Sequence, residues 1–228
     1  KRQDLNEANT FQSNTNKDTL RKILYETKAQ DLVNLYGDTF ETPLLTNDGI
    51  VIPEIGLKEA LRSGEYLNKV PTIAGSNKDE IKLWLGFSRY FIETKQSFLS
   101  KGIGIPTVEI KDEEKYQFYN EIRSKGWQLR GVQEPLENMF FAGNEDLYAY
   151  RYDWDNLRDF FVGDFSKIIG SAHALEIPMI SGDFSLAEEF AWIIYPRSPS
   201  RRFVSKNMMN FWTEFAKNGV PGISSNNI

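Results

Sequence analysis

Apolar residues recur with a helical period in several stretches of the chain. Leu20, Ile23 and Leu24 fall at i, i+3 and i+4, which predicts a short amphipathic helix capped by Asp18 or Thr19. The same period predicts further helices at residues 29–36, with Thr27 as cap and Gly37 as end, and at 201–218, ended by Gly219 before Pro221. Residues 116–136 are expected to form a helix-rich region.

Two stretches have the pattern of β-strands. Residues 70–75 are short, apolar and ended by a glycine, and residues 147–154 alternate well enough to form a second strand of the same sheet. The first is followed by a polar turn at 76–80 and a helical pattern at 81–85. A strand, a turn and a helix in this order form the βα unit of an α/β fold, in which reactive groups follow the carboxyl ends of the strands.

The remaining N-terminal segments are polar or rich in turn residues. Residues 1–16 carry many Asn and Gln side chains and predict a surface loop or a frayed end. Residues 39–55 contain Pro43, Pro53 and an Asn-Asp-Gly turn at 47–49, which predicts a short exposed hairpin or loop.

Composition narrows the function classes. With 228 residues, 40% of them apolar and 26% charged, the chain is long enough to bury a sizeable core. A net charge of −5 argues against nucleic acid as the main partner, and no apolar run approaches the ~20 residues of a membrane span. The absence of cysteine excludes disulfides, zinc–thiolate sites and a thiol nucleophile on this chain, and leaves the compartment open between cytoplasm and export.

The only histidine, His173, is the first candidate for chemistry, because imidazole exchanges protons near neutral pH. Small residues precede it at 170–172, and Glu176 and Pro178 follow, which indicates a side chain presented on a loop. A single histidine is, however, more often a surface or core residue than a catalytic one.

A carboxylate that follows the first predicted strand, Glu80, is the natural partner for such an imidazole. It precedes His173 by 93 positions, so only the fold brings them together, and a carboxylate that accepts from one ring nitrogen leaves the other free as a base. Alternatively, Asp79 and Glu80 are an acidic pair at a helix N-terminus. Asp153 and Asp155 suggest a metal site only weakly, and a solvated strand end explains them better.

Several motifs resemble one known family. Residues 75–80, Gly-Ser-Asn-Lys-Asp-Glu, followed by Lys82-Leu83, resemble the acid motif of the type-B carboxylesterases, the cholinesterase-like branch of the α/β-hydrolases. Residues 170–178 are similar to the histidine motif of that family. Three flanking blocks, at 48–53, 148–155 and 211–221, match in the same order, so the resemblance covers about residues 20 to 222.

The resemblance implies a fold and an activity. The fold is the C-terminal part of an α/β-hydrolase, with a mostly parallel central sheet flanked by helices. The activity is hydrolysis of a small carboxylic ester by a Ser-His-Glu triad without metal or organic cofactor, with Glu80 as the acid and His173 as the base. Asn77 and Glu176 are expected to anchor the histidine loop. Aromatic residues in regions that line the substrate pocket in this family are Trp84, Phe87, Phe91 and Phe140, for which structural packing is an equal alternative.

The chain also departs from the family pattern. It has no Gly-x-Ser-x-Gly nucleophile motif and no oxyanion-hole glycine cluster. Residues 1–228 are therefore expected to be part of a single domain whose serine lies upstream, with the N-terminal part of the same enzyme as partner. Ile81 stands where the cholinesterases of this family carry Gly after the acid, and Lys82-Leu83, together with the lack of cysteine, favours the bacterial branch. A hydrolase-like binding or adhesion module without catalysis is the alternative.

Overall fold

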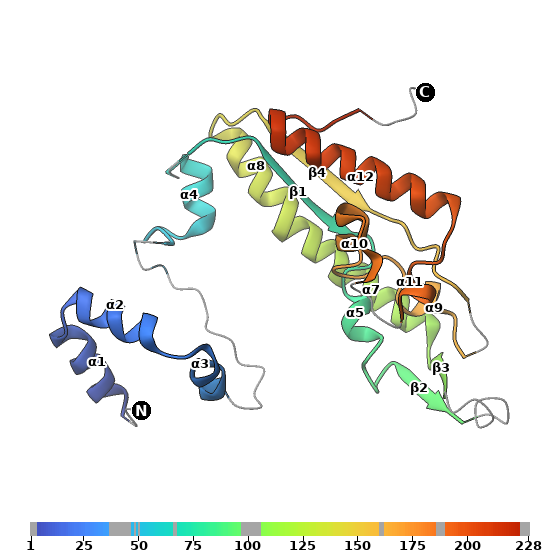
Figure 1. Ribbon diagram of the computed structural model, residues 1–228, viewed down its shortest axis with the longest axis horizontal. Helices are drawn as coiled ribbons and strands as arrows, with labels where there is room; N and C mark the ends of the chain where they lie inside the picture. The colour runs from blue at the N-terminus through green and yellow to red at the C-terminus, as the bar shows by residue number, and fades with distance from the viewer. Residues whose placement is uncertain are drawn as a thin grey trace. The chain divides into compact units, whose positions relative to one another are not determined.

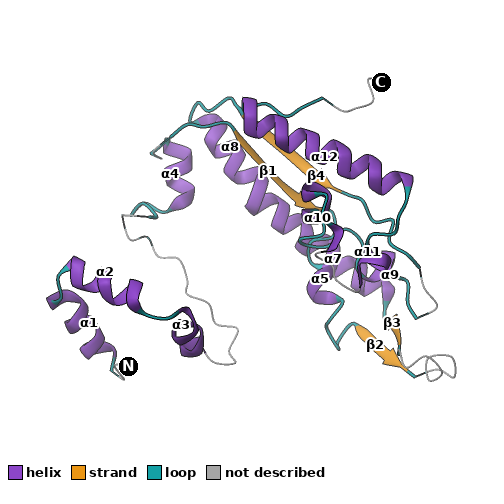
Figure 2. Cartoon of the chain, in the orientation of Figure 1, coloured by secondary structure: helices purple, strands orange, loops and turns teal. Residues whose placement is uncertain are grey.

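The computed structural model describes residues 4–36, 47, 49, 51–65, 68–96, 106–159, 162–185 and 190–223. The chain divides into two compact units, Lys1–Ile52 and Pro53–Ile228, which are considered separately. Figure 1 follows the chain from blue to red, and Figure 2 shows its helices and strands.

The first unit is helical in its described part. Its helices are α1 (Leu5–Asn14), α2 (Lys17–Glu26) and α3 (Ala29–Tyr36). The prediction of a polar loop over residues 1–16 is wrong, because Asp4 caps α1 by accepting a hydrogen bond from the Asn6 amide (2.8 Å). An exposed helix tolerates polar side chains on most of its surface, so a polar composition does not by itself exclude a helix.

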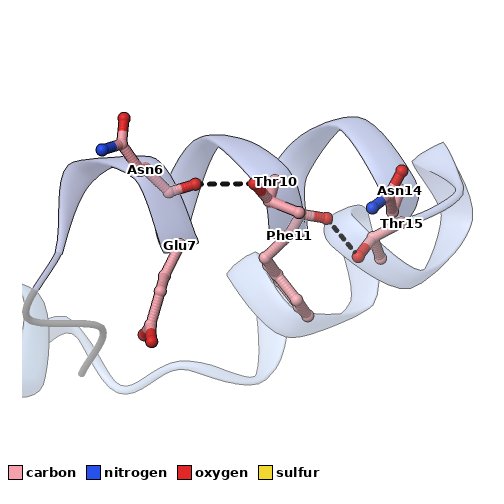
Figure 3. Close-up of a pocket in the computed structure, with 6 residues that line it drawn as sticks. All are labelled: Asn6, Glu7, Thr10, Phe11, Asn14 and Thr15. Carbon is pink, nitrogen blue, oxygen red and sulfur yellow. Dashed lines mark hydrogen bonds between the residues drawn. The ribbon is translucent and has the colours of Figure 1, made fainter.

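A pocket lies along α1 (Figure 3). Two threonine hydroxyls bond back to carbonyls one turn earlier, from Thr10 to Asn6 (2.8 Å) and from Thr15 to Phe11 (2.5 Å). These bonds satisfy the hydroxyls within the helix itself.

The caps of α2 and α3 differ from the predicted ones. Asn16, rather than Asp18 or Thr19, caps α2 by accepting from the Thr19 amide (2.8 Å). Thr27 ends α2 instead of beginning α3, and its hydroxyl donates to the Ile23 carbonyl (2.7 Å). Gly37 and most of the predicted hairpin at 39–55 lie outside the described residues. Within its described part, the Gly49 amide donates to the Ile52 carbonyl (2.8 Å) and closes a turn.

The second unit is built on a parallel pair of strands, β1 (Thr72–Asn77) and β4 (Leu147–Tyr152). Their register runs from Thr72 opposite Leu147 to Asn77 opposite Tyr152, so both strands end at the same edge. Both predicted strands are confirmed, as is the α/β class. Gly75 is required for close packing, because a Cβ there would lie 2.1 Å from the Tyr150 ring.

Helices contact both strands of this sheet (Figure 1). A long helical segment consists of α7 (Glu113–Gln128), a π-helical turn (Leu129–Gln133) and α8 (Glu134–Phe141), and its first two parts contact β1. Helix α12 (Pro199–Asn218) packs on β4 through the ring pair of Tyr150 and Trp212 (4.8 Å between centroids). The predicted helix-rich region at 116–136 and the predicted helix at 201–218 are confirmed, and Gly219 ends α12 with φ of 72°.

Shorter elements complete the unit. The predicted helix at 81–85 is confirmed as α5 (Lys82–Leu85), whereas an antiparallel hairpin of β2 (Ile92–Lys95) and β3 (Thr107–Ile110) was not foreseen. The other short helices, also not foreseen, are α4 (Leu57–Ser63), α9 (Phe165–Ile168), α10 (Ile177–Ser181) and α11 (Ala191–Ile194). None of the helices in the described ranges is long and apolar enough to cross a membrane.

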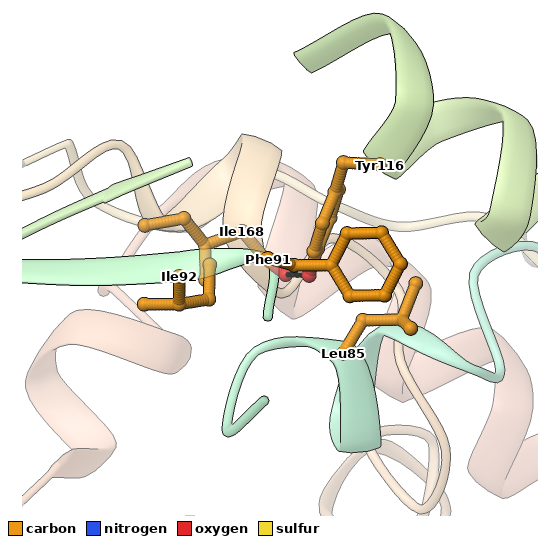
Figure 4. Packing of buried hydrophobic residues seen from close by; sticks show 5 residues of the cluster. All are labelled: Leu85, Phe91, Ile92, Tyr116 and Ile168. Atoms are coloured by element: carbon orange, nitrogen blue, oxygen red, sulfur yellow. Dashed lines mark hydrogen bonds between the residues drawn. The ribbon is translucent and has the colours of Figure 1, made fainter. Parts of the chain in front are cut away.

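Two hydrophobic clusters form the core of the second unit. One joins α5, β2, α7 and α9 and contains Leu85, Phe91, Ile92, Tyr116 and Ile168 (Figure 4). The other lies around the end of β4 and contains Tyr152, Met179, Tyr195 and Met208. The first cluster thus lies at α5, which follows β1, and the second lies at the end of β4.

Two buried tyrosines in these clusters provide a matched test of the packing. Burial raises the pKa of both phenols, so both are neutral hydrogen-bond donors. The Tyr116 hydroxyl donates to the Ile168 carbonyl (2.6 Å), whereas the Tyr152 hydroxyl has no partner among the described residues. Tyr116→Phe should lower the free energy of unfolding by about 1–3 kcal/mol, and Tyr152→Phe should leave it unchanged or raise it by up to about 1 kcal/mol. Urea denaturation measures both, and equal losses would contradict the assignment.

Candidate active site

The site lies where two segments meet beyond the carboxyl ends of β1 and β4. The turn after β1, residues 78–81, is held to β4 by the Lys78 amide, which donates to the Tyr152 carbonyl (2.9 Å). It is joined to the histidine loop by two backbone bonds. The Asp79 amide donates to Ser171 and the His173 amide donates to Glu80 (3.2 Å each). Segments about ninety residues apart in the chain are therefore fixed backbone to backbone.

The structure brings Glu80 and His173 together. His173 Nδ1 lies 2.8 Å from Glu80 Oε2, and Glu80 Oε1 accepts from the Asn77 amide (2.7 Å). Glu80 is 4% exposed, while the imidazole is 39% exposed. Because an ionised carboxylate only accepts hydrogen bonds, Nδ1 is the donor in this bond, and in the neutral imidazole Nε2 then keeps its lone pair. The imidazole is thus held by Glu80 through Nδ1 and remains partly exposed to solvent.

The helix-terminus interpretation of Asp79 and Glu80 does not hold. Helix α5 has no acidic residue in its first turn and no side-chain cap. Asp79 is buried and accepts from Asn120 Nδ2 (2.6 Å) and from the amide and hydroxyl of Ser171 (3.3 Å each). Its oxygen also lies 3.3 Å from the buried Lys82 ammonium. Asp79 therefore holds the turn in place through buried contacts, while Glu80 contacts the imidazole.

Asn77 and Glu176 anchor the histidine loop, as expected. Asn77 Nδ2 donates to the Ala172 carbonyl (2.7 Å) and to Glu176 Oε2 (2.6 Å). Burial raises the pKa of nearby Tyr150 to about 12, and the charges of Glu176 and Glu80 add to this shift. Tyr150 therefore stays neutral beside the two carboxylates.

The loop backbone has positive φ on either side of the imidazole, and one of the two residues is strained. Ala174, the residue after His173, has φ of 68° and is the non-glycine residue with positive φ in the described part of the chain. Such a conformation costs about 1–2 kcal/mol for a residue with a Cβ. Gly170 has φ of 54°, and a Cβ there would lie 2.4 Å from Asp79 Oδ2. The bonds to Glu80 and Asn77 hold the loop in this shape.

Two tryptophans flank the imidazole. The His173 ring stacks on Trp84 of α5 at 5.3 Å between centroids, with 30° between planes, and contacts Trp127 of α7 at 5.2 Å and 60°. The two indoles lie 5.8 Å apart and are 49% and 41% exposed. Trp127 was not among the predicted site residues. Its proximity depends on how α7 packs on the turn after β1, and its local sequence carries no signal of this.

The other predicted site residues lie elsewhere. Phe91 is 7% exposed and belongs to the core, where its ring packs edge-on against Tyr116. Phe87 is exposed beside a separate cavity, and Phe140 is exposed on α8 next to Phe141. Asp153 forms an ion pair with Arg151 (2.5 Å) and Asp155 forms one with Lys78 (3.1 Å). The hydrogen bond that Lys78 donates to Asp155 raises the pKa of Lys78. Of the four aromatic residues, Trp84 alone contacts His173.

Comparison with known proteins identifies the fold but not a family. No family model and no curated protein matches the chain. Among solved structures, the chain is similar to one described as a PNB esterase, with a TM-score of 0.58 and 17% sequence identity. The match covers 93% of this chain and 44% of that one. The chain therefore shares an α/β fold with less than half of that protein's length.

Two glycines provide a test of the loop geometry. Gly170→Ala should lower the free energy of unfolding by about 2–4 kcal/mol, because the methyl group meets Asp79 and the backbone is left-handed. Gly126→Ala, in α7 with no atom within 4 Å of the new methyl group, should raise it by about 0.5–1 kcal/mol. Urea denaturation of both variants checks this contrast. Gly170→Ala at parental stability would show that the loop takes another path.

Proposed function

We propose that this chain supplies the acid and the base of a carboxylic ester hydrolase, Glu80 and His173, and that a serine nucleophile comes from outside residues 1–228. The observation that carries the proposal is the 2.8 Å contact between Glu80 Oε2 and His173 Nδ1, which leaves Nε2 free of Glu80 in a side chain that is 39% exposed. The similarity in fold to a PNB esterase supports an ester as the substrate class.

The proposed reaction proceeds in two acyl-transfer steps. The serine hydroxyl attacks the ester carbonyl while His173 Nε2 removes its proton, and the same nitrogen then delivers that proton to the leaving alcohol. A water molecule next attacks the acyl-serine, and its proton passes through Nε2 back to the serine. Glu80 accepts the Nδ1 hydrogen throughout and stabilises the imidazolium. This chemistry requires no metal or organic cofactor.

The indoles of Trp84 and Trp127 support the same step. A cation next to the face of an indole is stabilised by about 0.5–2 kcal/mol. The effect requires the cation to lie within about 6 Å of the ring centroid. The centroids of both indole rings lie within this distance of the His173 ring centroid, at 5.3 and 5.2 Å. We infer that they stabilise the imidazolium that forms when the serine loses its proton.

A binding module without catalysis is the second candidate. The lack of a Gly-x-Ser-x-Gly motif within the 228 residues favours it. A binding scaffold, however, needs neither a buried carboxylate bonded to an imidazole nor a strained loop beside it. The cost of about 1–2 kcal/mol at Ala174 has a reason in an enzyme and none in a scaffold.

The first activity test is hydrolysis of a p-nitrophenyl ester by the protein that joins this chain to its nucleophile-bearing segment. His173→Ala and Glu80→Gln should each lower kcat by about 10⁴-fold, because one removes the base and the other its orienting acceptor. Glu109→Gln, which changes an exposed carboxylate on β3, is the matched control and should leave kcat unchanged. Parental rates for His173→Ala would exclude the mechanism, and parental rates for Glu80→Gln would assign the acid to another residue.

The second activity test concerns Trp127. Trp127→Leu should lower kcat by about tenfold, because the aliphatic side chain cannot stabilise the imidazolium, and Trp127→Phe should retain more of the rate. Trp192→Leu changes an exposed indole that contacts Arg158 and should have no effect on kcat. If the Leu and Phe variants at position 127 lose kcat equally, packing rather than ring electrostatics explains the contact.

A further inference from the structure

A cavity of about 740 Å³ lies beside α5 and is separate from the Glu80–His173 pair. Its walls come from α5, the β2–β3 hairpin, α9, α11 and the histidine loop. Most of its lining is apolar and includes Leu83, Phe87, Ile92, Phe165, Leu175 and Ile194. The volume is in the range of sites for small organic ligands, and the lining suits a hydrocarbon.

The residues that line the cavity include more cations than anions. Lys82 is paired with Asp79 (3.3 Å), and Glu93 is paired with Lys95 (3.3 Å). Two cations remain, Arg89 and Lys111, and neither has a carboxylate within ion-pair distance among the residues that the structure describes.

A hydrogen bond joins the Lys111 side chain to the backbone of Arg89. Lys111 Nζ donates to the Arg89 carbonyl (2.6 Å), and both side chains are exposed. A largely apolar cavity is therefore lined by two exposed cationic residues.

We propose that this cavity binds a long-chain monocarboxylate. Its hydrocarbon chain lies among the apolar side chains, and its carboxylate lies against Arg89 and Lys111. A guanidinium group binds a carboxylate through two parallel hydrogen bonds, and an adjacent ammonium adds a third donor. The site uses neither Glu80 nor His173. The proposal is therefore independent of ester hydrolysis and is tested by binding alone.

Calorimetric titration of the 228-residue chain tests the ligand class, with all ligands below their micelle concentrations. From octanoate through decanoate to dodecanoate, the affinity should rise by up to about fourfold for each methylene buried. Dodecanol should bind about tenfold more weakly than dodecanoate, because it lacks the charge-assisted hydrogen bonds, and dodecyltrimethylammonium should bind more weakly still. Equal affinities for the three C12 ligands would overturn the proposal.

Charge variants locate the head group. The double variant Arg89→Gln, Lys111→Gln should weaken dodecanoate binding by about tenfold and leave dodecanol binding unchanged. The control Arg62→Gln, Lys125→Gln removes the same charge from two exposed residues of other ion pairs and should change neither. Unchanged dodecanoate binding in the first variant would overturn the assignment.

Two further results distinguish a ligand site from a dimer interface and from binding at the imidazole. A chain that sediments as a dimer and does not bind dodecanoate would show that a second copy covers the cavity, which contradicts the proposal. His173→Ala should bind dodecanoate as the parent does, even where it abolishes hydrolysis. A loss of binding in that variant would place the ligand at the imidazole instead.

Discussion

The candidate site depends on one structural constraint, the hydrogen-bonded junction between the turn after β1 and the loop that carries His173. Parallel pairing of β1 with β4 brings the ends of both strands to one edge, and the bond from Lys78 to Tyr152 extends that pairing beyond the strands. Two backbone bonds and the side-chain amide of Asn77 then attach the loop to the turn. The contact between Glu80 and His173 is a consequence of this junction, because the backbone on both sides is already in place.

The junction contains unfavourable features that the rest of the unit offsets. Ala174 has a left-handed backbone, and Asp79 and Lys82 form an ion pair in the protein interior. A buried pair contributes little net stability, yet loss of either partner leaves an unpaired buried charge that costs several kcal/mol. Asn120 and Ser171 satisfy the remaining acceptor capacity of Asp79 and so make the pair tolerable. These free-energy costs are concentrated in residues close to the imidazole, as is common where a side chain must be held in a defined orientation.

Local sequence signals account for the elements that were predicted, and long-range contacts account for those that were not. The helical period and Gly219 were sufficient for α12, and a short apolar run ended by glycine indicated β1. Residue spacing did not place Glu80 near His173; its position after the first predicted strand made it a candidate partner, and the family resemblance gave it the role of the acid. Trp127 was missed because only the packing of α7 brings it to the imidazole, and Phe91 serves the core because the chain turns inward after α5. The helix α1 was missed because its cap, Asp4, lies in a segment judged by composition.

The most direct test of this account is NMR of the imidazole, which needs no residue assignment because the chain has one histidine. At mildly alkaline pH, the account predicts a proton bound to Nδ1 that is shifted downfield and protected from exchange, together with an unprotonated Nε2. Glu80→Gln should abolish the downfield shift. A histidine with its proton on Nε2, or with a freely exchanging Nδ1 proton in the parent chain, would contradict the central claim that Glu80 holds His173 ready to act as a base.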